Sequence, residues 1–169
     1  NLFSSAGTAP LNRPSVLFVC TANRIRSPLA AALFRQILLR ESRTLPRWRI
    51  NSAGTWVQKG EPPPAEVIRV GTLKGLDLTN HRAQEVNEGL LSSHNLILVM
   101  EHGHKESIQH VFPNLAERIY LLSEMNGENR EIKDPASMAQ AELEFLIEDL
   151  SRLLEAGLTR IVFLAHNKK

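Results

Sequence analysis

Residues 16–28 read Val-Leu-Phe-Val-Cys-Thr-Ala-Asn-Arg-Ile-Arg-Ser-Pro. The first five form a continuous apolar run, which is typical of a strand buried on both faces of a parallel sheet. Ser27 and Pro28 predict the start of a helix, because serine is a preferred cap and proline is preferred at the first helical position. Apolar residues then recur at helical spacing to about Arg40. The stretch therefore predicts a strand, a tight polar loop and a helix.

The same alternation continues along the chain. Further strands are expected at 48–53, 95–100 and 118–122, and further helices at 64–74, 101–111 and 138–155. Strands that alternate with helices predict an α/β domain with a parallel sheet and helices on both of its faces. Ligands bind such sheets beyond the carboxyl ends of the strands, which is where Cys20 lies.

The chain divides into three parts. Residues 1–14 lack the basic start and apolar stretch of a signal peptide, and we expect a flexible leader there. Residues 15–157 form the single domain. Residues 158–169 form a tail with a strand-like run, and the sequence leaves open whether it adds an edge strand or folds back over the surface.

Composition excludes several classes of function. The chain has 169 residues, a formal net charge of +2 and one cysteine. No block of Lys and Arg argues for nucleic acid, and no apolar run approaches the ~20 residues of a membrane helix. One cysteine forms no internal disulfide, so no oxidising compartment is implied and a cytoplasmic location is expected. It also supplies no cysteine-rich metal site.

The loop after Cys20 has the properties of a phosphate site. A loop between a parallel strand and a helix turns its backbone N–H groups inward at the positive end of the helix dipole. A thiolate is stabilised in such a place and becomes a nucleophile without a separate base. The Arg26 guanidinium donates two parallel hydrogen bonds to phosphate oxygens, and the Ser27 hydroxyl can hydrogen-bond the Cys20 sulfur. The alternative is that Cys20 is a small buried hydrophobe and Arg26 an ordinary surface cation.

The sequence resembles the low-molecular-weight protein tyrosine phosphatase family from about residue 15 to 155. The resemblance rests on several motifs in the expected order: Cys20 to Arg26, Ser27-Pro28, Asn51-Ser52-Ala53-Gly54-Thr55, His81-Arg82-Ala83, Leu98-Val99-Met100 and Asp134-Pro135. It implies a single three-layer domain with a four-stranded parallel sheet, no metal and no organic cofactor. It also implies hydrolysis of phosphate monoesters, with protein phosphotyrosine as the substrate and inhibition by phosphate-like oxyanions.

The resemblance assigns roles to particular positions. Cys20 would be the nucleophile, Arg26 the phosphate clamp and Asp134 the general acid and base. Asn23, Ser52 and His81 would hydrogen-bond the loop into shape. The phosphate-binding loop comprises Thr21, Ala22, Asn23, Arg24, Ile25 and Ser27.

Three positions depart from the family pattern. Ile25 stands where many members have a second cysteine, so peroxide is expected to inactivate Cys20 in a way that dithiothreitol rescues poorly. Arg24 replaces an apolar residue or Thr, and it either favours acidic substrates or points to solvent. Ala136 replaces an aromatic wall beside the phosphorylated ring. Trp56 either supplies one wall instead or has a core or surface role. The departures at positions 24 and 136 bear on substrate preference and not on the phosphate chemistry.

Two other functions fit the same motifs. One is a protein-arginine phosphatase on the same fold, for which Arg24 matches neither usual residue. The other is a non-catalytic phosphate-binding module, which would not need Cys20, Arg26 and Asp134 together.

Overall fold

The computed structural model describes residues 13–41 and 47–166. Within them lies a sheet of four strands in the order β2-β1-β3-β4, namely Arg49–Gly54, Ser15–Cys20, Leu96–Val99 and Ile119–Leu121. Every neighbouring pair is parallel. The expected four-stranded parallel sheet is confirmed. The expected leader lies almost wholly outside the described residues.

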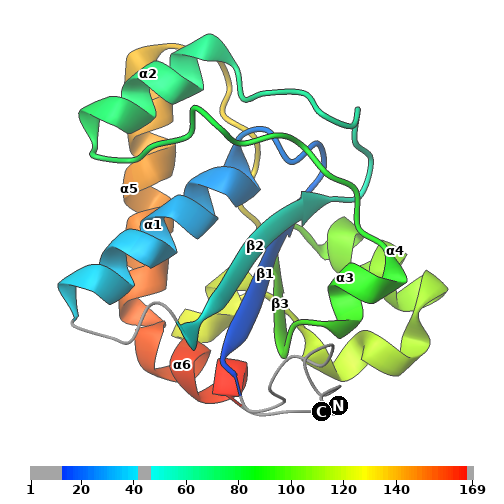
Figure 1. Cartoon of the computed structure of the whole chain (residues 1–169). Coiled ribbons are helices and arrows are strands. Elements are labelled where there is room, and N and C mark those ends of the chain that lie inside the picture. The colour runs from blue at the N-terminus through cyan, green and yellow to red at the C-terminus, as the bar shows by residue number, and fades with distance from the viewer. Residues whose placement is uncertain (1–12, 42–46, 167–169) are drawn as a thin grey trace, which may run out of the picture.

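Helices cover both faces of the sheet, which gives three layers (Figure 1). The helices on one side are α1, α5 and α6, and those on the other side are α3 and α4. Their bounds, with those of α2 and of two 3-10 helices, are Arg26–Arg40 (α1), Ala65–Leu73 (α2), Glu88–Ser92 (α3), His102–Val111 (α4), Pro113–Arg118 (η3), Leu122–Asn126 (η4), Gln140–Ala156 (α5) and Leu158–His166 (α6).

The central strand β1 decides this layering. Its side chains alternate between two hydrophobic clusters, with Val16 and Phe18 in one and Leu17 and Val19 in the other. All four are fully buried. A strand that is apolar on both faces needs a layer of helices on each side. The strand ends at Cys20, so the layers meet around the loop that follows.

Helix α1 begins at Arg26, with Ile25 at the N-cap position, so the expected cap at Ser27 and start at Pro28 are wrong in register. The reason lies in the Ser27 hydroxyl. It contacts the Cys20 sulfur and accepts a hydrogen bond from Asn23, so it does not cap the helix. Ser27 therefore contacts the residues of the loop and does not cap the helix.

The described part of the tail, residues 158–166, forms a helix, α6, and not an edge strand. Its buried residues Ile161, Leu164 and Ala165 follow helical spacing, although the β-branched residues around them favour a strand. Helix α5 ends before Gly157. The Ile161 N–H donates to the Gly157 carbonyl, so α6 follows α5 directly. The Asn95 side chain then donates to the Ala165 carbonyl at 2.7 Å and fixes α6 at the start of β3.

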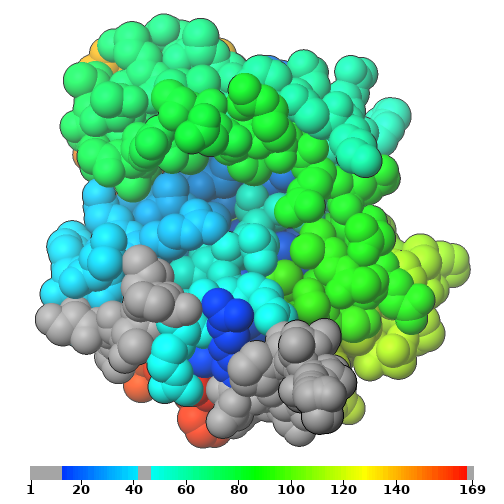
Figure 2. All heavy atoms as spheres, in the orientation of Figure 1, coloured from blue at the N-terminus to red at the C-terminus, as the bar shows by residue number. Residues whose placement is uncertain are grey.

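The segment after α2 lies against the loop that follows β1. Figure 2 shows this green segment lying over the blue start of α1 on the face in view. None of the helices within the described residues is long and apolar enough to cross a membrane.

Candidate active site

The loop 21–25 joins β1 to α1 at the carboxyl edge of the sheet. Asn23 adopts a left-handed conformation with φ of 58°, which asparagine tolerates better than most residues. Among the described residues, no acceptor takes the backbone N–H groups of residues 22–25. These free donors lie beside the start of α1, so the loop is suited to an anion.

The Asn23 side chain holds the loop in this shape. Its Nδ2 donates to Ser27 Oγ at 2.8 Å and to Ser52 Oγ at 2.9 Å. Its Oδ1 accepts from the Gln84 N–H at 2.9 Å. One buried amide thus ties the loop to α1, to β2 and to the segment that follows α2.

His81 supports the same residue from outside. Its Nε2 donates to the Asn23 carbonyl at 2.7 Å. Burial lowers the pKa of the His81 ring, and the nearby Arg82 and Arg35 lower it further, although the hydrogen bond to Asn23 opposes them. A neutral imidazole fits the bracing position that the resemblance gives His81.

Gly54 lets the end of β2 approach the loop. A Cβ at this position would lie 2.3 Å from the Thr21 carbonyl oxygen and 3.0 Å from the Asn23 nitrogen. Just beyond, the Thr55 N–H donates to the Cys20 carbonyl and the Trp56 N–H to the Thr21 carbonyl, both at 3.0 Å. The motif at 51–55 therefore supports the loop in two ways. Gly54 allows close contact between the two backbones, and Ser52 accepts a hydrogen bond from Asn23.

Cys20 is buried, and its Sγ lies 3.0 Å from Ser27 Oγ. The Ser27 oxygen accepts from Asn23, and its own hydrogen can go to the sulfur or to the Ala53 carbonyl, which lies 3.3 Å away. A thiolate accepts hydrogen bonds only, so the Ser27 hydroxyl can donate to the sulfur when it leaves as a thiolate.

Arg26 is 1% exposed and uses one end of its guanidinium for structure. Its Nη1 donates to Glu101 Oε2 at 2.5 Å and to the Ile132 carbonyl at 2.7 Å. Its Nε is buried and makes no hydrogen bond with good geometry. Asp134 Oδ1 lies only 3.0 Å from Nε, but it lies off the direction of the N–H. An unsatisfied buried N–H of a cation is costly, so an anion is expected to complete it.

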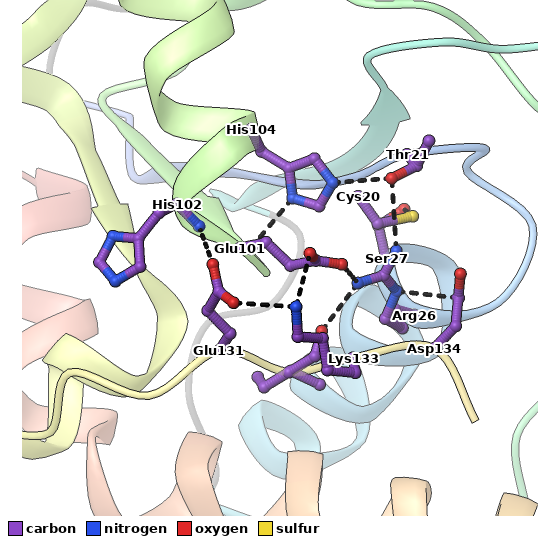
Figure 3. Close-up of polar contacts among 11 residues, drawn as sticks. Cys20, Thr21, Arg26, Ser27, Glu101, His102, His104, Glu131, Lys133 and Asp134 are labelled. Carbon is purple, nitrogen blue, oxygen red and sulfur yellow. Dashed lines mark hydrogen bonds and ion pairs between the residues drawn. The ribbon is translucent and has the colours of Figure 1, made fainter. Parts of the chain in front are cut away.

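Asp134 comes from the segment between η4 and α5, more than a hundred residues after Cys20. Its side chain is 65% exposed and points toward the Arg26 guanidinium (Figure 3). The structure therefore brings all three expected catalytic residues to one edge of the sheet.

Two further residues of this site, Glu101 and His104, were not among those expected from the sequence. Burial opposes ionisation of Glu101, but Arg26 and Lys133 outweigh it, so the pKa of the carboxyl lies below its usual value. His104 Nε2 lies 2.9 Å from Thr21 Oγ1. The pattern Glu-x-x-His directly after a buried strand was the available signal. No group of three or more His, Cys, Asp or Glu side chains in the described parts of the chain could hold a metal.

The expected specificity residues lie at the rim. Trp56 is 82% exposed, so its ring is not part of the core. Arg24 Nε donates to the Pro62 carbonyl at 2.8 Å, which holds this half-buried side chain against the rim. Ile25 is half-buried and packs against the core beside α1. Ala136 lines a cavity of about 280 Å³ together with Asp134 and Phe145.

Known proteins resemble this chain in sequence and in structure. The model of the family "Low molecular weight phosphotyrosine protein phosphatase" matches residues 15–163. A protein of Ralstonia nicotianae named "Probable low molecular weight protein-tyrosine-phosphatase EpsP" is 34% identical over 87% of this chain and 95% of its own. The "Protein-arginine-phosphatase" of Geobacillus stearothermophilus is 31% identical over 83% of this chain and 95% of its own. A crystal structure of the low molecular weight protein tyrosine phosphatase from T. tengcongensis superimposes with a TM-score of 0.80 at 30% identity, covering 87% of this chain and 99% of that one.

Proposed function

Since the chain belongs to the low molecular weight phosphotyrosine protein phosphatase family and is a phosphatase, we propose that it hydrolyses phosphate monoesters through a phospho-cysteine on Cys20. The observation that carries this proposal is the buried Arg26 Nε. It has no well-aligned acceptor, and it belongs to the same site as the free N–H groups of residues 22–25. A tetrahedral oxyanion beside Cys20 would satisfy both sets of donors.

The first step transfers the phosphoryl group to the protein. The Cys20 thiolate attacks phosphorus, an S–P bond forms, and the bond from phosphorus to the leaving oxygen breaks. Asp134 gives its proton to that oxygen. Charge on the three equatorial oxygens is stabilised by the loop N–H groups and by Arg26, which the Glu101 pair and the Ile132 carbonyl orient.

The second step returns the thiolate. Water attacks phosphorus while the Asp134 carboxylate accepts its proton, and the S–P bond breaks. The Ser27 hydroxyl at 3.0 Å stabilises the sulfur as it leaves. The products are inorganic phosphate and the free enzyme, with no cofactor consumed.

Protein phosphotyrosine is the substrate class that we favour. The relative from Ralstonia is named as a tyrosine phosphatase, and Trp56 offers an exposed aromatic side chain for a phosphorylated ring. Phospho-arginine is the second candidate, because the relative from Geobacillus is a protein-arginine-phosphatase. Phosphate-like oxyanions such as vanadate should inhibit either activity. A cytoplasmic location stays a prediction.

The experiment that tests this proposal measures hydrolysis of p-nitrophenyl phosphate by wild type and by Cys20→Ser. The expected result is turnover by wild type, inhibited by vanadate, and none by the variant. Turnover that survives the substitution would overturn the cysteine mechanism. Peptides with phosphotyrosine, phosphoserine and phospho-arginine then rank the substrate classes, and a preference for phospho-arginine would replace phosphotyrosine in the proposal.

A further inference from the structure

The Thr21 hydroxyl lies between two nitrogen atoms, one from His104 and one from Arg26. His104 Nε2 is 2.9 Å from Thr21 Oγ1, and Arg26 Nη2 is 3.4 Å from the same oxygen (Figure 3). The guanidinium has no acceptor atom, so Nη2 donates. The direction of the contact with His104 depends on which ring nitrogen carries the hydrogen.

The backbone of Glu101 decides that question. Its N–H donates to His104 Nδ1 at 3.0 Å, so Nδ1 carries no hydrogen and Nε2 carries one. Burial, followed by the nearby Arg26 charge, lowers the pKa of His104 to about 4, so the ring is neutral at physiological pH. His104 Nε2 therefore donates to Thr21 Oγ1.

The Thr21 hydroxyl consequently has one hydrogen left to give. An sp³ oxygen accepts through two lone pairs, and His104 and Arg26 occupy both. In the described parts of the chain, no acceptor takes the hydrogen. Thr21 directly follows Cys20, and its oxygen lies beside the guanidinium whose Nε also lacks a well-aligned acceptor.

We propose that the Thr21 hydroxyl donates a hydrogen bond to the oxyanion bound at Cys20, and that His104 is a positioning residue that fixes the direction of this donor. The inference rests on the proposed function, because it concerns the same anion site. Glu101 would serve twice, through its carboxylate on Arg26 and through its N–H on His104. Thr21 would thus bind the anion through its side chain as well as its backbone.

The test measures the affinity for orthovanadate by calorimetry, which does not depend on turnover. Thr21→Val should bind vanadate about tenfold more weakly, since a hydrogen bond to a charged group is lost, while Thr21→Ser should stay within about twofold of wild type. Thr21→Ala is a smaller variant without a hydroxyl, for use if valine disturbs folding. Equal affinity in wild type and in the folded variant without the hydroxyl would overturn the proposal.

His104 is tested with a matched pair of amides. Asn can replace Nδ1 as the acceptor of the Glu101 N–H but does not reach Thr21, whereas the longer Gln can place an N–H where Nε2 lies. We expect His104→Asn to weaken vanadate binding about fivefold and His104→Gln to restore most of it. His110→Asn, at an exposed position of α4, is the control for the substitution.

A double-mutant cycle separates positioning from general loosening of the structure. If His104 acts through the Thr21 hydroxyl, His104→Asn should change vanadate affinity little once Thr21→Val is present. Independent losses that add would contradict the positioning role. Absence of wild-type turnover on p-nitrophenyl phosphate would instead refute the proposed function. The affinity for vanadate would then still show whether the Thr21 hydroxyl donates to a bound oxyanion.

Discussion

Arg26 Nη1 and Glu101 Oε2 lie 2.5 Å apart, although the two residues are 75 positions apart in the sequence. Arg26 opens α1 after β1, and Glu101 precedes α4 after β3, so the pair exists because β1 and β3 are neighbours in the sheet. The ion pair fixes one end of the guanidinium and leaves Nε and Nη2 directed toward the site.

Arg26→Lys should abolish most activity, because an ammonium does not reproduce the planar set of donors. We expect kcat for p-nitrophenyl phosphate to fall at least about 10²-fold, since a preorganised charged donor contributes on this order. The charge is retained, so urea unfolding should show a folded protein. Arg40→Lys, in an exposed pair with Glu155, is the control and should retain wild-type kcat. A lysine variant within a factor of three of wild type would contradict the clamp.

Asn23→Ala should destabilise the protein by about 3 kcal/mol, because three hydrogen bonds of about 1 kcal/mol each are lost from a buried loop. Asn23→Gly loses the same bonds but accepts the positive φ, so it should be about 1 kcal/mol less destabilised. Urea midpoints measure both variants, and Asn80→Ala, at an exposed position, is the reference. A glycine variant less stable than the alanine variant would argue against the backbone assignment.

Asp134→Asn should affect poor leaving groups more than good ones. Phenolate needs a proton as it leaves, whereas p-nitrophenolate needs it less, so kcat/KM should fall about 10²-fold for phenyl phosphate and less for p-nitrophenyl phosphate. Glu106→Gln, exposed on α4, controls for loss of one carboxylate. Equal losses on the two substrates would remove Asp134 from the role of general acid.

His94 should make stability fall as the solution is acidified. Burial lowers the pKa of His94 to about 4. The ring also accepts from Asn51 at Nε2 and donates to the Leu90 carbonyl from Nδ1. The unfolded chain takes up a proton near pH 6.5 and the native state near pH 4, so stability is complete above pH 6.5 and is lost as pH falls to about 4.

The pKa of His94 thus differs by roughly 2.5 between the unfolded chain and the native state, which corresponds to roughly 3 kcal/mol in the free energy of unfolding. Urea unfolding of wild type and His94→Gln between pH 7 and pH 4 measures this contribution. The variant should lose about 3 kcal/mol less than wild type over the range. Parallel pH curves would show that His94 is not protonated on unfolding as described.

The sequence predicted the parts of the fold that depend on local pattern. The apolar run 16–20 and the helical spacing after Pro28 identified β1 and α1, since each pattern is a direct consequence of burial. The sequence left open whether the tail adds an edge strand or folds back over the surface. Thr159, Ile161 and Val162 favour strands, whereas the burial of residues 158–166 follows helical spacing. In this segment the contact between Ala165 and Asn95, at the start of β3, outweighs the local preference for a strand.

The sequence predicted those site residues that are close to one another along the chain. Cys20, Arg26 and Ser27 flank one short loop, at the end of β1 and the start of α1, so their proximity follows from their spacing. The link from Thr21 to His104 spans 83 positions and depends on the register of β1 against β3. No single-sequence pattern fixes that register, which explains why His104 was not expected at the site.

The most direct measurement is the detection of phosphate on Cys20 itself. Asp134→Asn enzyme would be mixed with p-nitrophenyl phosphate, quenched within the first turnover, digested and analysed by mass spectrometry. A single phosphoryl group on the peptide that contains Cys20, lost on longer incubation and absent after prior alkylation of the thiol, is the predicted result. Rapid release of p-nitrophenol with that peptide unmodified, or with phosphate on another residue, would contradict the covalent mechanism.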